Sequence, residues 1–289
     1  MREFILSTEN ACDLTKTQIE DMNVSVMPMN FYIDGEEFSS STSTLSTVDI
    51  CNKMEAGAIT RTSQPNETEI ENYLTTLLNS GKDILHLSFS SRMSGTCERF
   101  KFVANKLNET HKNKIYVVDT LCQSSGLGLL ISILNQKINE ANLSITEAVE
   151  LAESLKLSIV HFFMVDDLKY LARGGRIPKS IALIGNLIKL KPVLHVDNTG
   201  KIVQTQKVIG KKKAFHTIIE KFKKYYNGQS NKVFISEAKA IEDAEELKSE
   251  LLKINPNLDI TINPLGPIIV SHSGPGTLAL YFTAYTRNA

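Results

Sequence analysis

The sequence contains no long apolar segment. No window approaches the roughly 18 uninterrupted apolar residues of a membrane-spanning helix, and near the start only Phe4, Ile5 and Leu6 are apolar in succession. That run is far shorter than the apolar core of a signal peptide. We therefore expect a cytoplasmic protein.

Cysteine is scarce and scattered. The four cysteines are Cys12, Cys51, Cys97 and Cys122, and no two of them form a CxxC pair. Histidines do not cluster with them at the spacing of a metal site, and a disulfide framework is not expected at this length. We expect reduced thiols and no bound metal.

An excess of one charge is also absent, because Lys plus Arg and Asp plus Glu each number 32. A protein that binds nucleic acid or an anionic membrane through its overall charge would be basic. We expect no nucleic-acid partner and only transient membrane contact. The local run Lys211–Lys213 is typical of a solvated helix start, and a docking face for an acidic partner is the alternative.

Signature motifs of several protein classes are missing as well. There is no GxGxxG after the first predicted strand, no GxxxxGK[ST], no HExxH and no GxSxG. The sequence therefore offers no phosphate loop, no zinc-protease helix and no frame for a nucleophilic serine.

What the chain does have is a regular alternation of strand-like and helix-like segments. Such alternation predicts parallel strands joined by helical crossovers. One such pattern ends and another starts near residues 145–160, and 289 residues are enough for two domains. We predict the α/β class, with two α/β domains at residues 1–155 and 156–289 and a mainly parallel sheet in the first.

Some local predictions bear on the site. Val24–Phe31 is predicted as a strand broken by Pro28, and Ile268–Ser271 as the last strand. Pro192–Val196 and Ile202–Val208 flank a polar turn, which predicts a hairpin.

Two clusters of hydroxyl side chains precede predicted helices. Thr62-Ser63-Gln64-Pro65 precedes a helix predicted over Glu67–Asn79, and Ser94-Gly95-Thr96 follows a buried strand predicted over Asp83–Ser88. Free N–H groups and the positive dipole end at a helix start favour an anion, and Gly95 permits close approach. Without a lysine or metal, such a pocket suits one carboxylate better than a triphosphate.

Each cluster alone is more typical of a helix cap, since Ser and Thr are common at that position. The pairing favours binding, because the clusters follow successive predicted parallel units and ligands bind at the carboxyl ends of parallel strands.

Charged and titratable residues provide further candidates. His272, after the predicted strand Ile268–Ser271, could donate to a carboxylate or act as a base, and a structural histidine is equally compatible. Arg173 and Arg176 flank a Gly pair and suit carboxylate or phosphate. For Arg176 a solvated arginine at a helix end is slightly favoured.

The ordered set of motifs resembles the DegV family over essentially the whole chain. The motifs are Thr62–Pro65, Ser94–Thr96, Ala172–Ile177, Lys191-Pro192, Gly210–Ala214 and Gly266–Gly276. The resemblance implies two α/β domains with a fatty acid held between them, its tail buried and its head group bound by hydroxyls. It also implies a binding subunit that presents the carboxylate to an ATP-dependent fatty-acid kinase.

By the same resemblance, the ligand is a C14–C18 fatty acid whose carboxylate contacts Thr62 and Ser94. The residues nearby would be Ser63, Gly95, Thr96 and His272, and Arg173 would face the kinase partner. No catalytic residue and no cofactor are implied. The sequence departs from the family pattern at Glu9 and Asn10, where Thr-Asp-Ser or Thr-Asp-Thr is usual, so the detailed shape of the head-group site is open.

Two other functions are weighed against this one. A serine esterase or thioesterase could use Ser94 and His272, but the nucleophile frame and a third member are missing. A nucleotide- or sugar-phosphate-binding protein would normally have a phosphate loop. The apolar segments Ile181–Leu190 and Gly126–Leu134 could line a tail tunnel, although ordinary core is the favoured interpretation of both.

Overall fold

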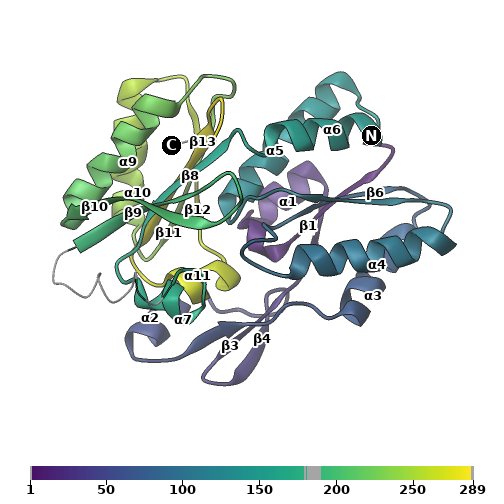
Figure 1. Cartoon of the computed structure of the whole chain (residues 1–289), viewed down its shortest axis with the longest axis horizontal. Helices are drawn as coiled ribbons and strands as arrows, with labels where there is room; N and C mark the ends of the chain where they lie inside the picture. The colour runs from purple at the N-terminus through teal and green to yellow at the C-terminus, as the bar shows by residue number, and fades with distance from the viewer. Residues whose placement is uncertain (1, 179, 181–189, 288–289) are drawn as a thin grey trace.

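The computed structural model describes residues 2–178, 180 and 190–287 (Figure 1). These residues form a four-stranded sheet, a six-stranded sheet and a three-stranded sheet. The first two stand in the two halves of the molecule, and the small sheet lies below them in Figure 1. The predicted α/β class is confirmed, and the sheet of the first half is entirely parallel.

The parallel sheet has the strand order β2-β1-β6-β7. Its strands are β1 (Ile5–Glu9), β2 (Val24–Met27), β6 (Ile84–Ser88) and β7 (Ile115–Asp119). The helices joined to them are α1 (Lys16–Met22), α3 (Glu67–Leu78), α4 (Thr96–Thr110), α5 (Ser125–Ala141) and α6 (Ile145–Leu155), with a 3-10 turn η1 (Asn10–Cys12). Apolar side chains of α3 and α4 pack on one face of this sheet, and α5 packs on the other.

The mixed sheet has the order β10-β9-β8-β13-β11-β12, and only its β11/β12 pair is parallel. Its strands are β8 (Ile159–Met164), β9 (Leu190–Val196), β10 (Ile202–Ile209), β11 (Lys232–Ala238), β12 (Asp259–Pro264) and β13 (Thr277–Thr283). The predicted hairpin is confirmed as β9/β10. Helices α9 (Lys211–Tyr225) and α10 (Ile241–Ile254) cover the outer face of this sheet.

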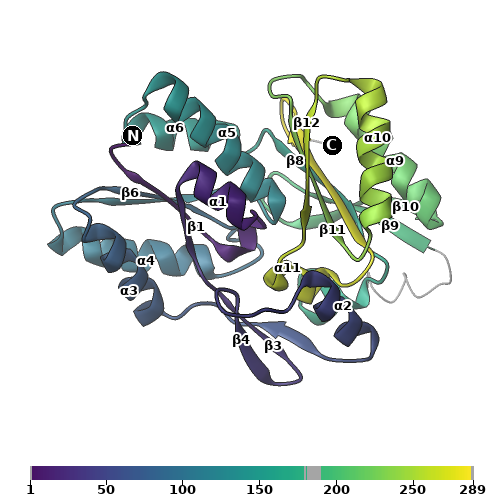
Figure 2. The same ribbon diagram turned by 180° about the vertical axis from the view of Figure 1, so that it is seen from behind.

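Helix α5 occupies the space between the two large sheets (Figure 2). It packs against β8, β11 and β13 of the mixed sheet while its other side meets the parallel sheet. The segment Gly126–Leu134 is therefore core, and none of its residues lines the cavity described below. The other predicted tail segment, Ile181–Leu190, lies outside the residues whose side chains the structure describes.

The small sheet is antiparallel, in the order β4-β3-β5. It contains β3 (Asn30–Ile33), β4 (Glu36–Ser39) and β5 (Thr60–Thr62), and near it lie α2 (Thr47–Glu55), α7 (Lys169–Arg173) and α11 (Pro267–Ser273). The single strand predicted over Val24–Phe31 is wrong. It is two strands in different sheets, because Pro28 cannot donate to a ladder and the chain leaves the first sheet there.

The strand predicted over Ile268–Ser271 is also wrong, because this segment belongs to helix α11. A short apolar run fits a buried helix as well as a strand. Pro267 occupies the first turn of the helix, where a missing N–H is harmless. The actual last strand is β13, whose seven residues are all buried.

The C-terminal segment is tied down by Arg287, which is 1% exposed. Its guanidinium donates to the carbonyl oxygens of Ile159, Leu121, Lys156 and Asp197. These carbonyls lie after β7, between α6 and β8, at the start of β8 and in the turn between β9 and β10, so one side chain ties together segments of both halves. None of the helices in the described part of the chain has the length and hydropathy to cross a membrane.

Replacing Arg287 by Met is expected to lower the free energy of unfolding by on the order of 3 kcal/mol, because several buried carbonyls lose their donor. Chemical denaturation measures this change. Tyr285→Ala serves as the control, since Tyr285 is 81% exposed in the same segment. Equal stability of the two variants would mean that the Arg287 contacts contribute nothing.

Candidate functional site

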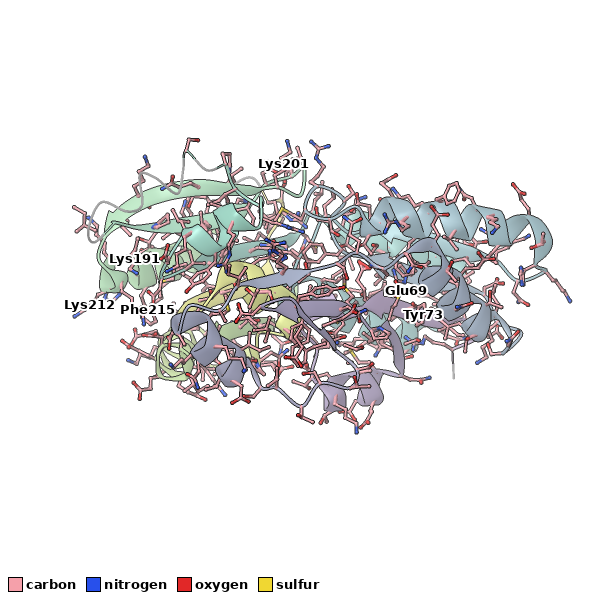
Figure 3. All side chains as sticks on the ribbon, turned by 90° about the horizontal axis from the view of Figure 1, so that it is seen from below. Glu69, Tyr73, Lys191, Lys201, Lys212 and Phe215 are labelled. Atoms are coloured by element: carbon pink, nitrogen blue, oxygen red, sulfur yellow. The ribbon has the colours of Figure 1, made fainter. Side chains whose placement is uncertain are left out.

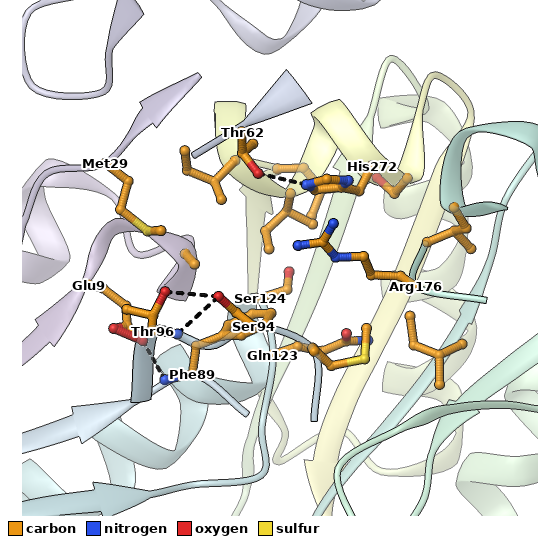
Figure 4. A pocket seen from close by; sticks show the side chains of 18 of the residues that line it. Glu9, Met29, Thr62, Phe89, Ser94, Thr96, Gln123, Ser124, Arg176 and His272 are labelled. Atoms are coloured by element: carbon orange, nitrogen blue, oxygen red, sulfur yellow. Dashed lines mark hydrogen bonds between the residues drawn. The ribbon is translucent and has the colours of Figure 1, made fainter. Parts of the chain in front are cut away.

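A cavity of about 310 Å³ lies where the three sheets meet. Its wall combines the end of β1, the loop before α4, the start of α5, the end of β5, and parts of α11 and β13. Most of the wall is apolar, with side chains such as Met29, Phe89, Phe163 and Ile268. The polar side chains gather at specific points (Figure 4).

One pair of polar side chains connects the small sheet to helix α11. Thr62 Oγ1 and His272 Nε2 are hydrogen-bonded at 2.8 Å. The histidine ring fits there because residue 174 is glycine, and a Cβ at that position would lie 2.3 Å from His272 Nδ1. Ser273, the next residue, also lines the cavity, and its hydroxyl has no partner among the residues that the structure describes.

The histidine of this pair is uncharged. Burial, together with the nearby charges of Arg176 and Arg173, lowers the pKa of His272 to about 3. A histidine with that pKa holds no extra proton at neutral pH, so it can make neutral hydrogen bonds but is a weak base.

The second polar point lies at the start of α4. Ser94 Oγ and Thr96 Oγ1 are hydrogen-bonded at 2.8 Å, and Thr96 N donates to Ser94 Oγ at 3.3 Å. Gly95 is the residue at the N-cap position, and no side chain caps this helix in the usual way. Gly95 does not line the cavity but lies against the side chain of Gln64.

The helix-cap interpretation of Thr62 and Ser63 is wrong. Asn66 caps α3, accepting from Glu69 N at 2.9 Å, and Glu69 completes the capping box. Both hydroxyl residues line the cavity instead. The reasoning about parallel strands was also wrong for this cluster, because Thr62 ends a strand of the antiparallel sheet.

Arg176 is the cation of the cavity wall. Its side chain points between the Thr62–His272 pair and the Ser94–Thr96 pair in Figure 4. Its Nη1 donates to the carbonyl of Gly174, and no described carboxylate lies within ion-pair distance of it. Burial lowers the pKa of this guanidinium, yet it remains charged. Sequence reasoning placed Arg176 in solvent, although the Arg-Gly-Gly-Arg spacing was the available signal.

The predicted partner-facing residue Arg173 is exposed and does not line the cavity. Its guanidinium lies 5.3 Å from the centre of the Tyr170 ring, and Nη2 lies 3.5 Å from Thr60 Oγ1. The structure thus separates the two arginines, with Arg176 inside and Arg173 at the surface.

The departure from the family pattern, Glu9, is fully buried in the cavity wall. Its Oε1 accepts from Phe89 N at 2.6 Å and from Ser88 Oγ at 2.9 Å. His86 Nε2 lies 3.6 Å from Oε2. The longer side chain therefore fastens the loop that leads to Ser94, and its own oxygens are occupied. Asn10 turns into η1, where its Oδ1 is buried without a partner in the described chain.

The basic run is remote from the cavity. Lys212 projects from the end of the mixed-sheet half in Figure 3, away from Glu69 and Tyr73 of the other half. Lys211 pairs with Asp243 at 2.5 Å. Within the described ranges, no group of three or more His, Cys, Asp or Glu side chains could hold a metal ion.

The fold and the cavity define a class, namely α/β proteins with a mainly apolar cavity whose described lining includes hydroxyls and one arginine. The model of the DegV family, described as uncharacterised proteins, matches residues 4–284. The chain therefore belongs to the DegV family.

Individual relatives match along their whole length. A DegV domain-containing protein of Lactococcus lactis is 33% identical over 280 residues, covering 96% of each chain. A solved DegV family protein from Thermus thermophilus, described for its fatty acid binding, has a TM-score of 0.87 and 26% identity, covering 98% of this chain and 100% of its own. A fatty acid binding DegV family protein from Streptococcus agalactiae has a TM-score of 0.85 and 27% identity, covering 98% and 99%.

Behind the cavity, Asp13 links the two halves of the chain. It accepts from Ser124 Oγ at 2.6 Å and from Gly266 N, at the start of α11, at 2.9 Å. Burial raises the pKa of Asp13 from 3.8 to about 7, although both donors lower it. The folded protein therefore binds this proton more tightly than the unfolded chain does.

Replacing Asp13 by Asn is expected to flatten the pH dependence of stability. A carboxyl with a raised folded pKa stabilises the protein fully below about pH 4, and this contribution is lost as the pH rises through about 7. The loss amounts to at most roughly 4 kcal/mol, at about 1.36 kcal/mol per pKa unit. Thermal unfolding between pH 4 and pH 8 compares the two proteins, and parallel curves would contradict the raised pKa.

Proposed function

We propose that this protein binds a long-chain fatty acid in the cavity and acts in the cytoplasm as a carrier without chemistry of its own. The observation that carries the proposal is Arg176, a cation in a mainly apolar cavity with no carboxylate partner in the described chain. Arg176 is half-buried, and a cation partly removed from water is stabilised by an anionic partner. A ligand with one carboxylate and a long apolar tail supplies what this wall lacks.

The carboxylate would lie between Thr62 and Ser94, within reach of Arg176. Hydroxyl and guanidinium donors give an anion the charge-assisted hydrogen bonds that it needs away from water. Ser63, Thr96 and neutral His272 contribute to the same polar region, and Gly95 sits just behind it. The fatty acid binding described for the Thermus thermophilus and Streptococcus agalactiae proteins supports this proposal.

The apolar wall accounts for affinity. Removing a C16 tail from water releases roughly 11 kcal/mol, at about 0.8 kcal/mol per CH₂. The cost of association and of ordering the acyl chain reduces this gain. The binding free energy that remains is still enough for a carrier to hold its ligand. We expect C14–C18 acids, palmitate among them, and no cofactor.

The carrier would present its ligand to an ATP-dependent kinase subunit, which would form the acyl phosphate. Arg173 is suited to contact such a partner, because it is exposed while the neighbouring Arg176 faces the cavity. A bidentate guanidinium recognises carboxylate or phosphate groups on a docking protein.

The alternative serine esterase has little geometric support. His272 bonds Thr62, whereas Ser94 bonds Thr96, so the nucleophile and the base are not paired. The low pKa of His272, about 3, also makes it a poor general base.

Native mass spectrometry of freshly purified protein is expected to show an added mass equal to that of a C14–C18 fatty acid. Adding palmitate to stripped protein should raise the Tm, because a ligand that binds only the folded state stabilises it. Protein that is always empty and shows no shift with palmitate or oleate would end the carrier proposal.

Changes in the head-group site are expected to weaken palmitate binding selectively. Ser94→Ala should cost about 1–3 kcal/mol, the loss of one donor to a charged group, and Arg176→Met should cost at least as much. Isothermal titration measures both. Hexadecanol, which lacks the charge, provides the control ligand, and its affinity should change far less in Arg176→Met. An equal loss for alcohol and acid would place the carboxylate elsewhere.

Arg173→Met is expected to leave palmitate affinity unchanged but to reduce acyl-phosphate formation by a matched kinase subunit at least tenfold. The affinity follows from titration and the phosphorylation from a coupled assay. Lys169→Met, on the same short helix and exposed, is the control. Full phosphorylation of the Arg173 variant would remove this residue from the partner surface.

A further inference from the structure

The cavity contains a polar side chain that the head-group site does not use. Gln123, just before α5, lines the cavity and is only 9% exposed. Its backbone N–H donates to His161 Nε2 at 3.3 Å. Its side-chain amide makes no hydrogen bond to the residues that the structure describes. The two donors and one acceptor of the amide therefore face the cavity.

The polar neighbours of Gln123 are already satisfied. The Tyr281 hydroxyl donates to Ser124 Oγ at 2.9 Å, and Ser124 Oγ donates to Asp13 at 2.6 Å. The Gln123 amide thus faces the cavity without a partner in the described chain, and a ligand oxygen could supply one.

Strand β13 runs along the cavity wall from Thr277 toward the corner that holds Gln123. Alternate residues of a strand face one side, and Thr277, Ala279 and Tyr281 all line the cavity. β13 starts shortly after His272 and reaches Tyr281, which pairs with His161, the residue that Gln123 contacts. From Thr277 to Tyr281 the strand covers roughly 13 Å, at about 3.3 Å per residue.

The intervening wall is apolar, because Ala279 stands opposite Phe163 in the sheet. Figure 4 also shows Gln123 on the opposite side of the cavity from Thr62 and His272. An extended alkyl chain advances roughly 1.25 Å per carbon, given a C–C bond of about 1.5 Å. The distance along β13 therefore corresponds to about ten carbons of an acyl chain.

We propose that Gln123 forms a second polar subsite, which binds a hydroxyl or keto oxygen carried near the middle of an acyl chain. The inference rests on the proposed fatty-acid function and deepens it. The preferred ligand class is then the mid-chain oxygenated fatty acid, held by its carboxylate at one end and by its oxygen substituent at Gln123. The amide can donate to a keto oxygen, and it can donate to or accept from a hydroxyl.

The test compares three acids on stripped protein: octadecanoic acid, 10-hydroxyoctadecanoic acid and cis-9-octadecenoic acid. The variant is Gln123→Met, which keeps the length of the side chain and removes its hydrogen bonds. Gln136→Met is the matched control, because Gln136 is exposed on α5 and bonds only Glu140. Thermal unfolding without ligand verifies that each variant is folded.

We expect Gln123→Met to weaken binding of the hydroxy acid about tenfold relative to octadecanoic acid, and Gln136→Met to change neither. If the affinity for the hydroxy acid relative to octadecanoic acid is the same in wild type and Gln123→Met, the subsite is overturned. That result is expected if the amide binds only water. An effect confined to the cis-9 acid would also overturn the subsite, because residue 123 would then discriminate the shape of the chain and not a hydrogen-bonding group on it. Failure of all three acids to bind would instead refute the fatty-acid function itself.

Discussion

The position of helix α5 between two sheets is the constraint on which the rest of the structure depends. A helix that contacts a sheet on each side must be apolar almost all round, and α5 is buried along most of its length. One end of the cavity lies at the start of this helix. Ser124, with its positive φ, and Gln123 lie at the point where the chain enters the shared core. The same packing that joins the halves thus shapes one end of the cavity.

The cavity combines polar groups that come from distant parts of the chain. Thr62 ends a strand of the small sheet, Ser94 precedes α4, Arg176 follows α7, and His272 ends α11. Ser94 and His272 are held in place by the residues behind them. Glu9 fastens the loop that leads to Ser94, Gly174 leaves room for the His272 ring, and Asp13 fixes the start of α11. These polar side chains therefore keep defined positions in the wall even when no ligand is bound.

Sequence reasoning captured what depends on local pattern. The alternation of strands and helices predicted the parallel sheet. Thr62 and Ser94, chosen from their place before predicted helices, both line the cavity, and their role in binding stays a prediction. It failed where tertiary contacts decide. The short apolar run Ile268–Ser271 is compatible with a strand or a helix. For Arg176, the sequence alone does not distinguish a solvent-facing side chain from one that lines a cavity. Gln123 carries no motif of its own, so only the packed structure shows that it lines the wall. The expected division at residue 155 stays a prediction.

The dispersal of the head-group residues has a consequence for the biogenesis of the protein. Residues 62, 94 and 176 can be in place long before residue 272 has been synthesised, yet α11 completes the wall and Arg287 secures the segment after it. A chain that ends before α11 therefore lacks part of the cavity wall. Under the proposed function, the ligand would be enclosed only after α11 and the segment around Arg287 have joined the rest of the chain.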